Sequence, residues 1–121
     1  MPRFVILYHE MPAGAERESH WDFMLEDGDH LLTWAFDKSP IETGSGEAIQ
    51  LPNHRLAYLT KEGPISGDRG TVQRIAAGTF EWNLREPDAI TVELAGKQIA
   101  SSVRLERASE TVWQWKLTGS A

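Results

Sequence analysis

The stretch HWDFML, residues 20–25, alternates polar and apolar side chains and indicates the fold of the whole chain. Side chains two positions apart on a β-strand point to the same face of the sheet. On such a strand His20, Asp22 and Met24 share one face, and the opposite face carries only aromatic and aliphatic groups. The stretch therefore predicts a core strand whose second face presents an imidazole and a carboxylate.

The rest of the chain shows the same strand-like pattern, and no segment has the i, i+3, i+4, i+7 apolar spacing of a helix. The Asp27-Gly28 pair is a strong hairpin signal. Many short strands separated by turn residues predict an all-β fold, a small compact antiparallel β-barrel-like domain. Residues 62–70, with three glycines and a proline, are predicted to be irregular. The predicted strands are residues 4–9, 20–26, 31–36, 47–51, 55–60, 71–75, 79–83, 89–94, 97–106 and 111–117.

The composition indicates one domain spanning residues 1–121, with a hydrophobic fraction of 40% that is sufficient for a core. No run approaches the ~20 apolar residues of a membrane-spanning helix, and the first apolar run is too short for a signal peptide. We therefore expect no membrane contact and a cytoplasmic location. The chain has no cysteine, so metal ligands are limited to imidazole nitrogens and oxygens.

The formal net charge of −6 does not suggest a general nucleic-acid binder, because such proteins usually carry excess positive charge to neutralise phosphates. A nucleic-acid contact therefore requires a local basic cluster. Arg55, Lys61, Arg69 and Arg74 fall in one region of the sequence and can supply it. The alternative interpretation is that these residues are ordinary solvated surface.

Two of the four histidines lie near the carboxylate of the opening stretch. His9 ends the first predicted strand, and with His20 and Asp22 it forms a two-histidine, one-carboxylate set. Such a set suits manganese, zinc, iron or nickel, and the spacing does not choose among them. A purely structural role for a lone histidine such as His9 is the alternative. His30 follows the Asp27-Gly28 turn and is predicted to be exposed.

The remaining histidine, His54, stands four residues before Tyr58. Taken alone, the two residues are typical of a half-buried polar pair. Beside a metal, an imidazole and a phenol can instead donate to a bound phosphate or act as general acids for a leaving group.

Seven short motifs occur in a fixed order along the chain: His9, HWDF at 20–23, LTWA at 32–35, NHRLAY at 53–58, Glu62-Gly63, GTV at 70–72 and GTFE at 78–81. Together they resemble the 3′-phosphoesterase domain of bacterial DNA ligase D. The resemblance runs from about Phe4 to the closing Trp115-Lys116-Leu117, which is nearly the whole chain.

The resemblance implies a compact barrel-like fold with a polar crevice that holds a divalent metal, typically manganese, although zinc or another transition metal can serve. It implies that His9, His20 and Asp22 are the metal ligands. The expected activity is the healing of DNA 3′ ends, by removal of a terminal 3′ phosphate or 3′ ribonucleoside. Expected partners are primer-template 3′ ends and a repair ligase or polymerase in trans, because we expect a stand-alone domain without the amino-terminal extension of the ligase-fused forms.

The resemblance also implies roles around the scissile phosphate. His54 and Tyr58 are expected to be catalytic and phosphate-binding, with His54 as the principal catalytic group. The family's His-x-Asp-x-Arg motif ends in an arginine that contacts phosphate, whereas this chain has Met24, which carries no charge and donates no hydrogen bond. Arg55 and Arg69 are the cations expected to replace it. The glycine-rich loop of the family is shortened to residues 66–70.

Three functions are compatible with these observations. The first is a metal-dependent phosphoesterase, which the joint presence of His54 and Tyr58 favours. The second is a catalytically weak or inactive metal-binding module that recruits DNA or a repair partner, and the third is a metal-dependent enzyme of another class. Loss of one phosphate donor slows such reactions about 100- to 1000-fold, so Met24 weakens the expectation of catalysis more than that of metal binding.

Overall fold

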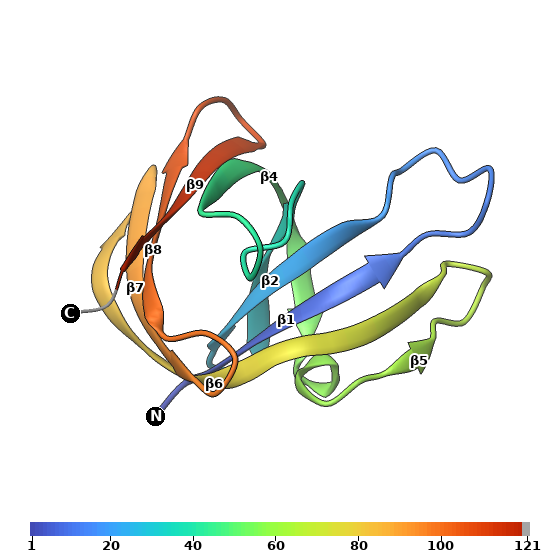
Figure 1. Ribbon diagram of the computed structural model, residues 1–121, viewed down its shortest axis with the longest axis horizontal. Helices are drawn as coiled ribbons and strands as arrows, with labels where there is room; N and C mark the ends of the chain where they lie inside the picture. The colour runs from blue at the N-terminus through green and yellow to red at the C-terminus, as the bar shows by residue number, and fades with distance from the viewer. Residues whose placement is uncertain (120–121) are drawn as a thin grey trace.

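A single antiparallel sheet forms the body of the molecule in the computed structural model, which describes residues 1–119. The strand order is β1-β2-β3-β4-β9-β8-β7-β6-β5, and β1 also pairs with β6, so the sheet closes into a ring (Figure 1). This confirms the predicted all-β, barrel-like fold. No helix in the described residues is long and apolar enough to cross a membrane. The elements are β1 (Arg3–Glu10), β2 (His20–Asp27), β3 (His30–Phe36), β4 (Ser45–Arg55), the 3-10 helix η1 (Leu56–Leu59), β5 (Gly63–Pro64), β6 (Thr71–Glu86), β7 (Ala89–Gly96), β8 (Ser101–Arg107) and β9 (Val112–Gly119).

The long strand β6 closes the ring, pairing with β1 along its first half and with β7 along its second. The prediction of two strands, 71–75 and 79–83, is wrong, because one continuous strand runs through residues 76–78. A Cβ on Gly78 would collide with the carbonyl oxygen of Ala95 on β7, so the glycine permits a close approach of the two strands.

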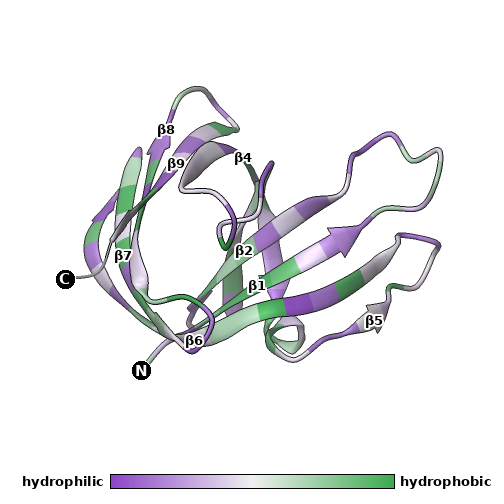
Figure 2. Cartoon of the chain, viewed as in Figure 1, coloured by the Kyte–Doolittle hydropathy of each residue, from purple (hydrophilic) through white to green (hydrophobic). Residues whose placement is uncertain are grey.

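The predicted alternation of residues 20–25 is confirmed, and it divides the apolar side chains between two clusters. Phe23 and Leu25 point into the ring and join the large inner cluster, whereas Met24 points outward. Figure 2 shows the same alternation of hydrophobic and hydrophilic residues along the strands. The second group, here called the outer cluster, consists of Val5, Leu7, Met24, Leu31, Leu59, Ile65 and Val72.

Residues 56–70, here called the covering segment, supply Leu59 and Ile65 to the outer cluster and so pack over the outside of β1 and β2. The predicted strand 55–60 is wrong, because residues 56–59 form η1. Positions three apart lie on the same side of a 3-10 helix, and Leu56 and Leu59 both pack against the outer cluster. The predicted irregularity of residues 62–70 is confirmed apart from the two residues of β5.

Two further strand boundaries differ from the predictions. Strand β4 does not end at residue 51 but continues to Arg55, because a shift of register opposite Leu32 leaves Pro52 outside the regular ladder, where its missing N–H needs no partner. Strand β8 begins only at Ser101. The preceding residues form a turn in which the amide of Gly96 donates to the carbonyl of Ile99.

Substitution of Gly78 by alanine tests the close approach of β6 and β7. Gly78→Ala is expected to lower the free energy of unfolding by about 1–3 kcal/mol, as overpacking of a well-packed interior does. Gly44→Ala is the matched control, because a Cβ at Gly44 meets no atom within 4 Å, and its effect should stay below about 1 kcal/mol. Urea unfolding measures both, and equal effects would contradict the close approach.

Candidate metal centre

The structure brings the three predicted metal ligands together on the outer face of β1 and β2. His9 is directly opposite His20 in the antiparallel pair, and Asp22 lies two residues further along β2 on the same face. One ligand atom from each residue lies within 4.8 Å of the other two. His20 and Asp22 are buried and His9 is half-buried, so a cation held there would be largely shielded from water.

Backbone carbonyls hold one nitrogen of each imidazole. His9 Nε2 donates to the carbonyl of Arg69 over 2.6 Å, and His20 Nδ1 donates to the carbonyl of Glu18 over 2.9 Å. Because a carbonyl only accepts, these bonds leave the lone pairs of the neutral rings on His9 Nδ1 and His20 Nε2. Metal-binding histidines are usually fixed in this way through their second nitrogen.

The two lone pairs face the carboxylate of Asp22. His9 Nδ1 lies 3.4 Å from Asp22 Oδ2, and His20 Nε2 lies 3.1 Å from Asp22 Oδ1. Asp22 Oδ1 is buried and accepts no hydrogen bond within residues 1–119, so its contact with His20 Nε2 is not a hydrogen bond. Electron-rich atoms this close repel one another unless a proton or a metal ion lies between them, and two imidazole nitrogens with a carboxylate are a donor set that fits a divalent metal.

Charge interactions within the cluster agree with this arrangement. Burial raises the pKa of the Asp22 carboxyl, but the two histidines together outweigh burial and leave that pKa below its usual value. Asp22 also raises the pKa of His9, because protonation of His9 Nδ1 would let that nitrogen donate to the carboxylate, and burial opposes the rise. The carboxylate is therefore ionised at neutral pH, as a metal ligand must be.

Two loops carry the carbonyls that hold the histidines. The loop 11–19 is closed at its base by a bond from the amide of Met11 to Ser19 Oγ, which places Glu18 beside His20. The turn that contains Arg69 reaches His9 because Gly70, at φ 88°, has no Cβ and packs directly against the backbone of Glu10. Sequence reasoning missed both carbonyls, since every residue has one and only loop geometry selects them.

Arg17 is the arginine whose guanidinium touches the cluster. Its Nη2 donates to His20 Nε2 over 3.3 Å, which agrees with a lone pair on that nitrogen, because a guanidinium only donates. Arg17 was not among the predicted site residues. Arg17 lies in a polar loop, and nothing in the local sequence indicates a site residue there. Its contact with His20 arises only when the folded loop lies beside β2.

Met24 follows Asp22 on the same face, but its side chain is fully buried in the outer cluster. Leu59 and Ile65 of the covering segment belong to the same cluster, so the side chain at position 24 has an apolar environment. The position that carries the phosphate-contacting arginine in the resembled family therefore serves packing in this chain.

His54 and Tyr58 pack against each other with ring centroids 5.3 Å apart and an edge-to-face geometry. His54 Nδ1 donates to the carbonyl of Pro52 over 2.9 Å, which leaves Nε2 available. Within residues 1–119 no hydrogen bond or ion pair joins either side chain to His9, His20 or Asp22. Their catalytic role therefore stays a prediction. His30, predicted to be exposed, is half-buried beside Asp27 and Asp29.

Three of the four predicted phosphate-binding residues, Tyr58, Arg55 and Arg69, line one small hollow, whereas His54 is not part of its lining. The hollow, here called the cationic cavity, has a volume of about 150 Å³. Arg69 connects it to the metal centre, because its side chain lines the cavity and its carbonyl accepts from His9. The lining residues are Arg55, Ala57, Tyr58, Lys61, Ile65, Ser66 and Arg69.

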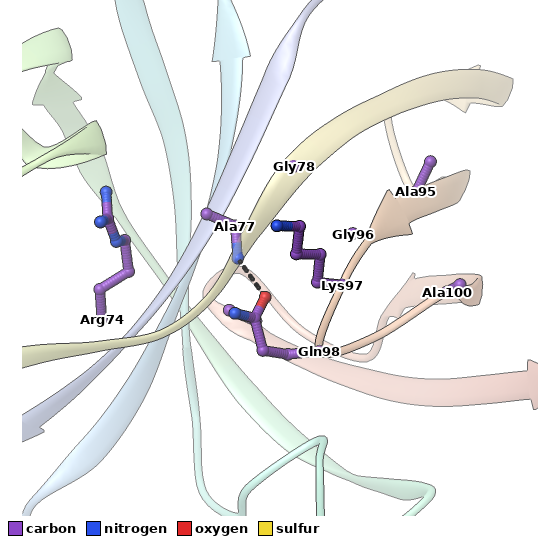
Figure 3. Close-up of a pocket in the computed structure, with 9 residues that line it drawn as sticks. Arg74, Ala77, Gly78, Ala95, Gly96, Lys97, Gln98 and Ala100 are labelled. Atoms are coloured by element: carbon purple, nitrogen blue, oxygen red, sulfur yellow. Dashed lines mark hydrogen bonds between the residues drawn. The ribbon is translucent and has the colours of Figure 1, made fainter.

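A wider hollow of about 680 Å³ lies between β6 and the turn that joins β7 to β8 (Figure 3). Its lining includes Arg74, Lys97 and Gln98, and Gln98 accepts a hydrogen bond from the amide of Ala77 over 3.4 Å. The remaining lining residues are alanines and glycines. Because this hollow has no histidine or carboxylate in its lining, it does not suit a metal.

The fold and the cluster together define a small all-β domain with a candidate two-histidine, one-carboxylate metal centre on the outer face of a closed sheet. The chain belongs to the DNA Ligase D 3′-phosphoesterase domain family, whose pattern matches residues 13–109. That range includes His20, Asp22, His54 and Tyr58, and His9 precedes it.

Curated relatives agree with the family assignment. The chain is 34% identical to the multifunctional non-homologous end joining protein LigD of Mycobacterium bovis and to the corresponding DNA repair protein LigD of Mycobacterium tuberculosis H37Rv. Each alignment covers 119 residues, which is 91% of this chain. The same alignments cover only 15% of each relative, so this chain is similar to one part of those proteins.

Replacement of the bridging carboxylate tests the metal centre. Asp22→Asn is expected to weaken Mn²⁺ binding more than about 100-fold, because loss of even an outer hydrogen-bond partner of a ligand typically costs 10- to 100-fold. Asp29→Asn is the matched control, since the Asp29 side chain is 98% exposed. Calorimetric titration with MnCl₂ measures both variants, and equal affinities would show that Asp22 is not a ligand.

Proposed function

We propose that this protein is a divalent-metal-dependent phosphoesterase that heals DNA 3′ ends by removing a terminal 3′ phosphate or 3′ ribonucleoside. The observation that carries the proposal is the convergence of two imidazole lone pairs on the buried carboxylate of Asp22. Membership of the 3′-phosphoesterase domain family supports the reaction class.

We propose His9, His20 and Asp22 as the ligands of the metal, with manganese as the expected ion and zinc or another transition metal as substitutes. Nitrogen and carboxylate ligands in this ratio suit those ions. When bound, such an ion supplies Lewis-acid polarisation of a phosphoryl oxygen and templates the substrate.

Side chains of the protein supply the proton for the leaving group and the positive charge beside the phosphate. In hydrolysis of a 3′ phosphate, a water oxygen bonds to phosphorus while the bond from phosphorus to the 3′ oxygen breaks. The departing 3′ oxygen needs a proton, which His54 in its protonated form or Tyr58 supplies as general acid. The products are inorganic phosphate and a 3′-hydroxyl end.

Arg17 is the additional cation we propose for the reacting phosphate. Its Nη2 donates to His20 Nε2, and if that nitrogen held a metal instead, the guanidinium would be available to donate to a phosphoryl oxygen. Charge-assisted contacts from a guanidinium to phosphate are among the stronger hydrogen bonds in proteins. Arg17 would thereby compensate for the uncharged side chain at Met24.

The relatives are named as non-homologous end joining proteins, which supports DNA ends as the substrate. This chain matches only a small part of them. We propose that a repair ligase or polymerase acts on the 3′ end once it is healed.

An end-trimming assay tests the proposal. With Mn²⁺ and a primer-template ending in a 3′ phosphate or one 3′ ribonucleotide, the protein should release the terminal group and leave a 3′ hydroxyl. His20→Ala should abolish the reaction, and His54→Ala should slow it about 100- to 10,000-fold, as loss of a general acid does. His30→Ala is the control and should retain the activity, because His30 belongs neither to the proposed metal ligands nor to the His54–Tyr58 pair. Gel electrophoresis and phosphate release measure the activity of the wild-type protein and the three variants.

The opposite result would identify the second candidate function. Tight Mn²⁺ binding without end trimming at high protein concentration would indicate a metal-binding module that recruits DNA or a repair partner. The apolar burial of Met24 is the observation that favours this alternative, because the site then lacks a cation at that position.

A further inference from the structure

The cationic cavity has a charge that sets it apart from the rest of this acidic protein. Its charged lining residues, Arg55, Lys61 and Arg69, are all cations. None of the three forms an ion pair with a carboxylate within residues 1–119. By contrast, four other arginines each have a carboxylate partner, and these are Arg3, Arg85, Arg104 and Arg107.

The carboxylates nearest in sequence do not neutralise the cavity. Glu62 accepts a hydrogen bond from the amide of Arg74. Asp68 lines a different hollow, between the covering segment and the end of β1. The cavity therefore presents unneutralised positive charge, in a chain that has 18 acidic and 12 basic residues.

The donors of the cavity suit a tetrahedral oxyanion. Arg69 is held in place by its own turn, because its Nε donates to the carbonyl of Ser66 over 2.7 Å and its Nη2 donates to Ser66 Oγ over 3.2 Å. These neutral acceptors position the guanidinium without removing its charge. Arg and Lys, which supply the charge of the lining, are the usual partners of phosphate oxygens.

The cavity is adjacent to the metal centre but separate from it. None of His9, His20 and Asp22 lines it, yet the carbonyl of Arg69 accepts from His9. Arg69 is therefore shared by the two sites. A nucleic-acid strand carries a phosphate at every nucleotide, so a strand with one phosphate at the metal centre brings a second phosphate nearby.

We propose that the cationic cavity binds the internucleotide phosphate next to the reacting one. This inference rests on the proposed function of the metal centre. It gives Arg55 and Arg69 a different phosphate from the scissile one, and it adds Lys61 to the set.

The test is a double-mutant cycle on binding, which does not require turnover. Fluorescence anisotropy measures the affinity for a 3′-phosphorylated oligonucleotide and for the same strand with an uncharged methylphosphonate at the linkage next to the 3′ end. In the wild-type protein the neutral linkage should weaken binding about 10-fold, the equivalent of one charge-assisted hydrogen bond. In the Arg55→Ala/Lys61→Ala variant the natural strand should bind about 10-fold more weakly, with little further loss from the methylphosphonate.

Salt dependence gives a second measurement. The slope of log Kd against log salt concentration should fall by roughly 0.7–1 for each cation removed. Lys116→Ala is the matched control, because Lys116 on β9 is opposite Ser45, which is at the other end of β4 from Arg55. This control should bind both strands as the wild-type protein does.

Either of two binding results would overturn the inference: a methylphosphonate effect of equal size in the wild-type protein and the variant, or an unchanged affinity of the variant for the natural strand. A third contradicting result would be displacement of the bound strand by inorganic phosphate, when both are present at the same concentration of phosphate groups. Failure of the proposed function gives a different outcome. In that case the binding cycle shows the expected coupling, but Mn²⁺-loaded protein leaves the 3′ phosphate in place.

Discussion

The structure depends on the burial of β1 and β2 on both of their faces. An antiparallel sheet commonly packs one face on the core and leaves the other in water. Here the outward side chains of Val5, Leu7 and Met24 have no exposed surface. Burying such a side chain contributes about 1.5–3 kcal/mol, and this burial requires the covering segment. The outer cluster thus fixes the segment that carries Tyr58 and Arg69, and the polar ligands lie on the same face beyond the apolar contact.

Local patterns were sufficient to predict the fold class and most of the strands. The two-residue alternation of residues 20–25 and the Asp27-Gly28 hairpin depend only on residues that are close in sequence. Both are present in the structure. The errors occurred where a distant partner decides the conformation. The sequence predicts two strands, 71–75 and 79–83, where the structure has the single strand β6, because the close contact of Gly78 with Ala95 on β7 cannot be seen in a local window. Leu56 and Leu59 form a helical turn because the outer cluster requires both side chains on one side.

In the candidate site, too, the features set by local sequence could be predicted and those set by distant contacts could not. Strand spacing and the resemblance together predicted His9, His20 and Asp22, since two neighbouring strands suffice to bring them together. The groups that orient these ligands could not be predicted, because the carbonyls of Glu18 and Arg69 are backbone atoms selected by loop geometry. Arg17 belongs with them, as its contact with His20 depends on how the loop 11–19 closes.

The turn that contains Arg69 has a thermodynamic consequence. One residue contributes its carbonyl to His9 and its guanidinium to the cationic cavity, and Gly70 holds the turn against the backbone of Glu10. If an ion at His9 or an anion at Arg69 reduces the motion of this turn, it lowers the entropy loss that the other ligand must meet on binding. Linkage then requires each ligand to raise the affinity of the other by the same factor. A metal ion bound at His9 would therefore be held most tightly while an anion occupies the cationic cavity.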